Sequence, residues 1–336
     1  MIKFILRRLA LGILVILGVV IVTFIMTRVV PSNPAAQWVG PRATPEQIQA
    51  AKKELGLDQP LYVQLGIYVK NLFTGNLGKS LKTHQPVILE LENYLPATIE
   101  LVLLSTFVAA LIGLPLGVIS AKQKDRWLDH FSRFFSVGAV SLPTFWVGLF
   151  LQLIFYRWLG VLPLGGELST NIKLAYQIPH ITGFLLLDSL ITGNMVVFKD
   201  ALLHFILPGI TVALYPIGLV ARMTRSALLE ILGEDYIRAA RSYGLPERTV
   251  LWSYALKNSL GPTITVLTLS IGYTLTNTFL IEAIFSWPGI GSYIANSILS
   301  LDYPAIMGVT IFAALAYVLL NLIADIIIAL DPRVRL

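Results

Sequence analysis

The residue types that perform catalysis are present in this chain, but none of them stands at a catalytic spacing. Its 336 residues include no cysteine, which excludes thiol chemistry, disulfides and cysteine-based metal sites. Neither an HExxH pair nor a GxSxG elbow occurs. The four histidines are scattered without the spacing of metal ligands, and we expect them to be incidental: His84, His130, His180 and His204. The sequence therefore predicts no metal site.

One short string imitates a nucleotide-binding motif. Gly78-Lys79-Ser80 looks like the end of a phosphate-binding loop, but such a loop requires another glycine five residues before Gly78, where Phe73 stands. The similarity is accidental, so no cofactor is predicted. We expect the chain not to be an enzyme, and ATP hydrolysis, if it energises this protein, must occur on another chain.

The longest polar interval in the C-terminal half, residues 222–262, has the pattern of a docking element. Glu234 and Asp235 stand where a helix would begin, Arg238 and Arg241 follow within two turns, and Gly244 stops it. Acidic residues at the start, basic residues at the end and a terminal glycine suit the helix dipole and a left-handed C-cap. Residues 234–244 are therefore predicted to form a short helix.

One side of this predicted helix could receive a partner. Tyr236, Ala239, Ala240 and Tyr243 share a side at helical spacing, giving a small face with alanine at its centre and aromatic edges. An amphipathic helix lying on lipid headgroups would show the same pattern, and the residues alone favour neither interpretation. Pro246 suits the first position of a second helix.

The elements that position this interval are membrane spans. The chain is 56% apolar and 13% charged with a mean hydropathy of +0.75, whereas a soluble domain carries about 25% charged residues. We predict an all-α integral membrane protein with six transmembrane helices, within residues 9–27, 101–121, 134–156, 201–221, 258–281 and 305–324. In such a protein the net charge of +6 gives no reason to expect nucleic acid as a partner.

The distribution of basic residues predicts the orientation. Lysine and arginine concentrate at both termini, after the second span and in residues 222–257, which places the N- and C-termini in the cytoplasm. Residues 183–198 are apolar but short and contain Asp188. A span there would put residues 222–257 outside, so we expect an external re-entrant or surface segment.

Three regions follow from this topology. Residues 1–30 hold the N-terminal cytoplasmic end and the first span, residues 31–100 form a small external domain, and residues 101–336 form a five-helix core. Gly113 and Gly117 are small residues four apart in the second span, where they could serve either close packing within the chain or a dimer face.

Polar residues inside spans indicate a candidate translocation path. The fifth span carries a row of them leading to an acid: Ser270, Tyr273, Thr274, Asn277, Thr278 and Glu282. The hydroxyl groups could instead bond back to their own backbone or hold helices together. Asp325 in the sixth span lies either buried with a partner or at the cytoplasmic headgroup boundary.

Several strings resemble a known family. Residues 235–245 look like the coupling loop of ABC-importer permeases, with Ala239-Ala240 followed by Gly244, although Arg238 stands where many members have glutamate. Residues 282–291, EAIFSWPGIG, and the Asp302-Tyr303-Pro304 that follows are similar to the dipeptide and oligopeptide branch. N-terminal strings such as residues 31–34 and 55–60 extend the resemblance over nearly the full length.

The resemblance implies a type I ABC-importer fold and a peptide permease of the cytoplasmic membrane. Its implied partners are a second permease, two ATP-binding subunits that carry ATP and Mg²⁺ and dock on residues 234–244, and an external solute-binding protein, in addition to membrane lipid. Nickel chelates, glutathione and oligosaccharides are alternative substrates within the family. A self-sufficient secondary transporter or channel is the alternative outside it, although no convincing internal repeat is present.

Overall fold

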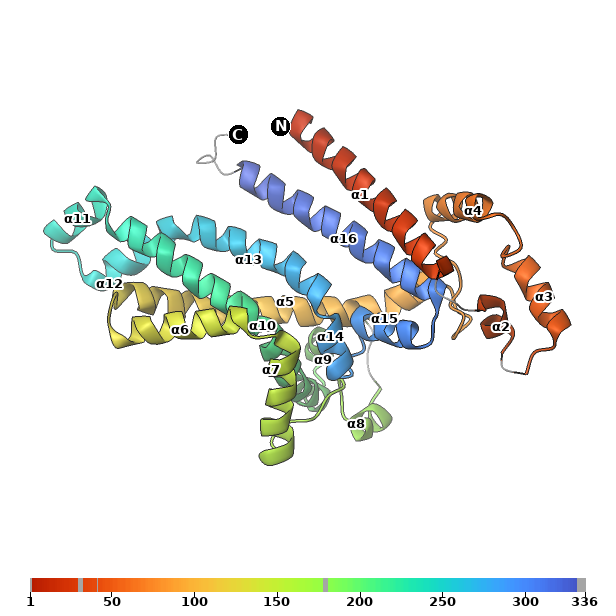
Figure 1. The fold of residues 1–336 in the computed structure, drawn as a ribbon. Helices are drawn as coiled ribbons and strands as arrows, with labels where there is room; N and C mark the ends of the chain where they lie inside the picture. Colours follow the sequence, from red (N-terminus) through yellow and green to blue (C-terminus); the bar gives the residue numbers. More distant parts are fainter. Residues whose placement is uncertain (1, 30–32, 41, 178–180, 331–336) are drawn as a thin grey trace. The chain divides into compact units, whose positions relative to one another are not determined.

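The computed structural model describes residues 2–29, 33–40, 42–177 and 181–330 (Figure 1). Side chains of residues 2–6, 28, 29 and 323–330 are outside this description. All regular elements in these ranges are helices, and the one β interaction within them is an isolated bridge between Lys79 and Pro86. The chain divides into two compact units, Met1–Pro96 with Pro288–Leu322, and Ala97–Trp287 with Ile323–Leu336.

The first unit contains the N-terminal helices and those that follow residue 288. They are α1 (Ile2–Val29), α2 (Pro34–Val39), α3 (Pro45–Glu54), α4 (Leu61–Phe73), the start of α5 (Val87–Lys122), α15 (Ile290–Leu299) and most of α16 (Tyr303–Leu330). Helix α1 lies beside α16 (Figure 1). A Cβ atom added at Gly12 would come within 2.6 Å of Val318, so the missing side chain allows this close approach.

Local sequence signals start the short helices of this unit. Asn33 accepts a hydrogen bond from the backbone N–H of Ala36 at 3.2 Å, and proline follows it at the first position of α2. Thr44 and Gln47 form a complete capping box at the start of α3, with distances of 3.3 and 2.9 Å.

A buried carboxylate joins two strings that are far apart in the chain. Asp302 is buried and accepts hydrogen bonds from the Ser80 hydroxyl at 2.5 Å and from the backbone N–H of Leu81 at 3.1 Å. Lys79-Ser80, which imitated a phosphate-binding loop, therefore belongs to a turn anchored on Asp302-Tyr303-Pro304. Nearby, the rings of Tyr94 and Tyr293 stack at 5.0 Å.

The second unit contains the remaining helices and most of α5. They are α6 (Trp127–Ser141), α7 (Thr144–Leu151), η1 (Gln152–Trp158), α8 (Thr170–Ala175), α9 (Leu185–Ile191), α10 (Met195–Leu232), α11 (Asp235–Ser242), α12 (Glu247–Thr249), η2 (Val250–Leu256), α13 (Lys257–Asn277) and α14 (Phe279–Ile284). Its largest buried cluster includes Leu101, Phe205, Leu207, Phe285 and Trp287.

Four helical segments are long and apolar enough to cross a membrane: Arg7–Thr27, Val87–Lys122, Met195–Leu232 and Tyr303–Leu322. The segments Trp127–Ser141 and Thr144–Trp158 make a fifth if they are one broken span. The prediction of an all-α protein with apolar spans is confirmed at this level. The fifth predicted run is helical as α13, but its polar composition keeps it outside this set within the described residues.

The third predicted run is not one straight helix. The chain bends by 105° between α6 and α7. Leu142 has φ −77° and ψ 136°, an extended conformation, because the Pro143 ring disfavours helical geometry in the residue before it. The third predicted span is therefore interrupted within residues 134–156.

Residues 183–198 do not form a separate spanning helix. Helix α9 has only seven residues, Gly193 at φ +68° ends it, and α10 begins at Met195. The buried carboxylate of Glu100 accepts hydrogen bonds from the backbone N–H groups of Leu185 and Leu186, at 3.0 and 2.8 Å. Helix α9 is thus held against α5.

The two glycines of the second span pack within the chain. A Cβ atom at Gly113 would lie 2.8 Å from Val220, and one at Gly117 would lie 2.6 Å from Thr224 and 2.7 Å from the Ala221 carbonyl. Both glycines therefore face α10 at close range. Of the two roles left open for them, this arrangement supports packing of α5 on α10.

Candidate functional site

The predicted polar helix exists as α11. Glu234 precedes it in an extended conformation, Asp235 lies in its first turn, and Gly244 follows it at φ +77°, which favours glycine. Arg238 pairs with Asp235 at 2.6 Å on the surface. Arg241 pairs with Glu247 at 2.8 Å across the turn, and this guanidinium lowers the pKa of the Glu247 carboxyl.

One member of the predicted face points into the protein. Ala240 is only 6% exposed and packs, with fully buried Ile237, in a cluster that includes Val118, Leu228 and Val250. The expectation that Ala240 would lie at the centre of an outward face was therefore wrong. Ile237 and Ala240 are three positions apart, so the turn that buries isoleucine buries Ala240 too.

The outward side of α11 keeps the other predicted residues. Glu234, Asp235, Tyr236, Arg238, Ala239, Arg241, Tyr243 and Gly244 are all exposed. Tyr243 is 87% exposed, more than any other large apolar or aromatic side chain in the described part of the chain. Asn258 donates to the Tyr236 hydroxyl at 3.1 Å, which connects α11 to α13.

Two further aromatic side chains were missed in the sequence. Trp252 and Tyr254 on η2 are 49% and 41% exposed, whereas Val250, Leu251 and Ala255 of the same turn are buried beneath α11. Bulky aromatic residues inside a polar interval were the available signal. We define the α11 surface as the exposed side chains of residues 234–244 together with Trp252 and Tyr254.

A buried ion pair connects three helices of the second unit. The Asp129 carboxylate accepts from Arg225 Nε and Nη2 at 2.6 and 2.7 Å, from the Ser120 hydroxyl at 2.6 Å and from the Asp125 backbone at 2.9 Å. Asp129 is fully buried. No local pattern predicts this site, because Arg225 of α10 lies 96 residues from Asp129 of α6.

The predicted path residues lie where α13 packs on α10. The rings of Tyr215 and Tyr273 stack at 4.5 Å, and the hydroxyls of Thr224 and Thr263 lie 3.3 Å apart. A hollow of about 490 Å³ includes Ser270 and Tyr273 in its lining. A smaller hollow of about 50 Å³ is lined in part by Tyr273, Thr274, Asn277 and Thr278.

The hydroxyl groups of α13 also bond back to their own backbone, which was the alternative to a role in lining a path. The Ser270 hydroxyl donates to the Leu267 carbonyl at 2.7 Å, and the Thr274 hydroxyl donates to the Ser270 carbonyl at 2.8 Å. These bonds satisfy the donors inside the helix. The hydroxyl oxygens can still accept a hydrogen bond from a molecule in the hollow.

The predicted acid Glu282 lies away from both hollows. Glu282 is fully buried, lines neither hollow, and accepts from the Thr98 hydroxyl at 2.8 Å. Close by, Trp287 Nε1 donates to the Ala97 carbonyl at 2.9 Å, which fixes the EAIFSW turn against α5. The side chain of Asp325 lies outside the described residues.

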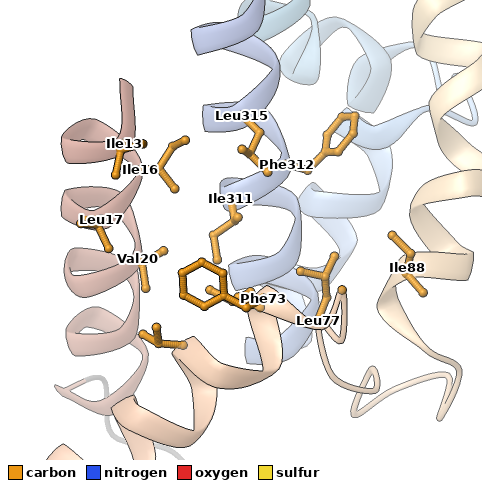
Figure 2. A pocket seen from close by; sticks show the side chains of 13 residues that line it. Ile13, Ile16, Leu17, Val20, Phe73, Leu77, Ile88, Ile311, Phe312 and Leu315 are labelled. Atoms are coloured by element: carbon orange, nitrogen blue, oxygen red, sulfur yellow. The ribbon is translucent and has the colours of Figure 1, made fainter. Parts of the chain in front are cut away.

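A second large hollow, in the first unit, is lined by apolar residues. Figure 2 shows it in the first unit, with Ile13, Leu17 and Val20 of α1 facing Ile311 and Leu315 of α16. Its volume is about 430 Å³, and every residue that lines it is apolar or glycine. Such a surface suits lipid chains and offers no side-chain hydrogen bond to a polar solute. The α10–α13 hollows are therefore the better candidates for a path.

The fold and these sites define a class. Apolar helices of spanning length carry an exposed amphipathic helix on a buried base, and polar side chains line hollows between two of the long helices. No group of three or more potential metal ligands occurs among the described side chains. This arrangement is that of a multi-pass membrane protein with hollows between its long helices.

Comparison with known proteins gives the family. Residues 113–336 match the binding-protein-dependent transport system inner membrane component, and residues 1–102 match the N-terminal region of such membrane components. The chain belongs to this family of ABC-importer permeases.

Full-length relatives are similarly named. The chain is 46% identical over 323 residues to the probable D,D-dipeptide transport system permease protein DdpB of Escherichia coli, covering 96% of this chain and 94% of that protein. It is 40% identical over 336 residues to the dipeptide transport system permease protein DppB of Alkalihalophilus pseudofirmus, covering both chains completely. Identity to DppB of Escherichia coli is 37% over 338 residues, covering 100% of this chain and 99% of that protein.

Proposed function

We propose that this chain is the transmembrane permease subunit of an ABC importer that carries dipeptides or short oligopeptides across the cytoplasmic membrane. The observation that carries the peptide assignment is its similarity along the whole chain to relatives named as dipeptide permeases. The α10–α13 hollows support it, because their largely apolar walls carry a few polar side chains that could orient a zwitterionic solute.

The proposed topology has six spans with both termini in the cytoplasm. The bent α6–α7 pair is one of these spans. Helix α13 is another, and α10 covers part of its polar side, so that these polar groups do not face lipid. Residues 31–100 form the external domain. The α11 surface then faces the cytoplasm.

In this arrangement the α11 surface docks on an ATP-binding subunit. Exposed tyrosine, tryptophan and arginine side chains are the types that dominate protein interfaces. Two such subunits hydrolyse ATP with Mg²⁺, a second permease completes the membrane part, and an external solute-binding protein delivers the substrate. Closure of the ATP-binding subunits would be transmitted through Ile237 and Ala240 to α5 and α10.

Peptides are preferred over nickel chelates, glutathione and oligosaccharides because the similar relatives carry peptide names. A self-sufficient carrier or channel is disfavoured, because it would leave the α11 surface without a role. Purification of the tagged chain from native membranes tests the assembly. We expect two ATP-binding subunits, a second permease and a solute-binding protein to accompany it; recovery of the chain alone would refute the proposal.

A further inference from the structure

The larger α10–α13 hollow has a lining suited to a small zwitterion. Its volume is about 490 Å³, and its walls combine the aromatic Tyr215 and Tyr273 with the aliphatic Leu219 and Val266, the Ser270 hydroxyl and Arg222. A site with apolar walls and a few polar groups that fix orientation is the usual form of a small-molecule site.

The stacked tyrosines separate this hollow from the smaller one. Tyr215 and Tyr273 line both hollows, and their rings lie 4.5 Å apart with an angle of 26° between the planes. Arg222 is two turns beyond Tyr215 on α10, nearer to α11. The larger hollow is therefore on the α11 side of the tyrosine pair.

Arg222 differs from its neighbour Arg225. One turn further along, Arg225 is neutralised by Asp129, to which it gives two hydrogen bonds. Arg222 is exposed, lines the hollow and forms no ion pair within the described part of the chain. Arg222 directly follows the predicted span of residues 201–221, so it lies at the cytoplasmic end of the hollow, where its guanidinium is available to a bound ligand.

We propose that Arg222, with the stacked Tyr215 and Tyr273 as its wall, forms a subsite for the carboxylate of the transported peptide. The proposal rests on the proposed function. A guanidinium binds a carboxylate through two parallel hydrogen bonds, a geometry that an ammonium group does not provide. An anionic lipid phosphate has the same charge, so the test must separate the two ligands.

The chain has no cysteine, so a single introduced thiol reports on the hollow without background from this chain. In the assembled transporter, Val266→Cys is labelled with a maleimide with and without saturating dialanine or dialaninamide, and modification of this chain is read by mass spectrometry. We expect dialanine to slow labelling and dialaninamide, which lacks the carboxylate, to have little effect. Lys124→Cys, in the exposed turn after α5, is the control that neither peptide should protect.

Arg222→Gln should weaken protection by dialanine roughly tenfold or more, because a hydrogen bond to a charged group is lost. Arg222→Lys should retain part of the protection, while Lys257→Gln, which removes an exposed charge at the start of α13, should leave it unchanged.

Three results would overturn the subsite. The first is equal protection by both peptides, and the second is no effect of Arg222→Gln on protection by dialanine. The third is protection by phosphatidylglycerol vesicles with none by dialanine, which would assign Arg222 to a lipid headgroup. If the wild-type transporter accumulates dialanine in any of these cases, the proposed function stands and only the subsite fails.

Discussion

Asp129 and Arg225 form a bidentate ion pair with distances of 2.6 and 2.7 Å, and the carboxylate is completely buried. The pair connects α6 to α10, one turn from Arg222 and on the same helix that leads into α11. It therefore fixes the end of α10 whose buried cluster, with Leu228, Ile237 and Ala240, supports the α11 surface. We call this buried cluster the base of α11.

Breaking this pair should destabilise the protein strongly. Removal of Arg225 leaves the fully buried Asp129 carboxylate unpaired and costs about 3–5 kcal/mol, whereas removal of Asp129 leaves an arginine that is 19% exposed and should cost less. We expect Asp129→Asn and Arg225→Gln each to lower the Tm in detergent, and the double variant to lose less than the sum of the two. Lys257→Gln is the control for the loss of a surface cation. Single variants with the Tm of the wild type would show that the pair does not hold α6 on α10.

The α11 surface should tolerate substitutions that its base does not. Tyr243 is 87% exposed, so Tyr243→Ala should change the stability of the isolated chain by no more than about 0.5 kcal/mol. If it is an anchor for the ATP-binding subunit, affinity for that subunit should fall by roughly 30-fold, the equivalent of about 2 kcal/mol.

Tyr62→Ala on α4, where the tyrosine is 77% exposed, is the matched control. Titration of the purified ATP-binding subunit onto each variant measures the effect. Equal affinities for the Tyr243 and Tyr62 variants would remove Tyr243 from the docking interface. Ala240→Glu should instead unfold the base, because it puts a charge among buried apolar residues.

The close packing of α5 on α10 gives a matched pair of glycines. Gly117→Ala places a Cβ atom 2.6 Å from Thr224, whereas Gly138→Ala on α6 meets nothing within 4 Å. Overpacking costs about 1–3 kcal/mol. We expect the Gly117 variant to unfold at a lower temperature than the wild type and the Gly138 variant to be at least as stable. A reversed order would contradict the close α5–α10 contact.

Glu167, between η1 and α8, should make stability depend on pH. Burial raises the pKa of this carboxyl to about 7, with the charge of Glu100 adding to the effect and Lys173 opposing it. Because the folded state holds this proton more tightly than the unfolded state, stability should fall as the pH rises from about 4.5 to about 7 and then level off. Thermal unfolding measured at intervals from pH 5 to pH 8 should show this fall in the wild type and a smaller one in Glu167→Gln. If the unfolding temperature falls equally with pH in the wild type and in Glu167→Gln, Glu167 is not the source of the pH dependence.

Local signals were sufficient for α11 and for the four apolar helices of spanning length. Capping and dipole preferences near Glu234 and Gly244 act within the helix itself, so sequence alone placed its ends. Periodicity did not show which side is buried, because that depends on how α11 folds back on Leu228 of α10 and on Val118 of α5, which lies far away in the chain.

Contacts between distant positions could not be predicted from one sequence. Ser80 and Asp302 are 222 residues apart, and Asp129 and Arg225 are 96 apart. The sequence around each of these residues has a recognisable local pattern, but nothing in the sequence shows that the two members of a pair are in contact. The bend at Pro143 did carry a signal, since the residue before proline avoids helical geometry.

Uptake of radiolabelled dialanine into proteoliposomes that contain the chain, its permease partner and the ATP-binding subunits tests the central claim most directly. With the solute-binding protein outside and ATP inside, accumulation against a gradient is expected, and omission of ATP or of the binding protein should abolish it. Accumulation driven by an ion gradient with this chain alone, or no accumulation by the complete assembly, would contradict a peptide-importing ABC permease.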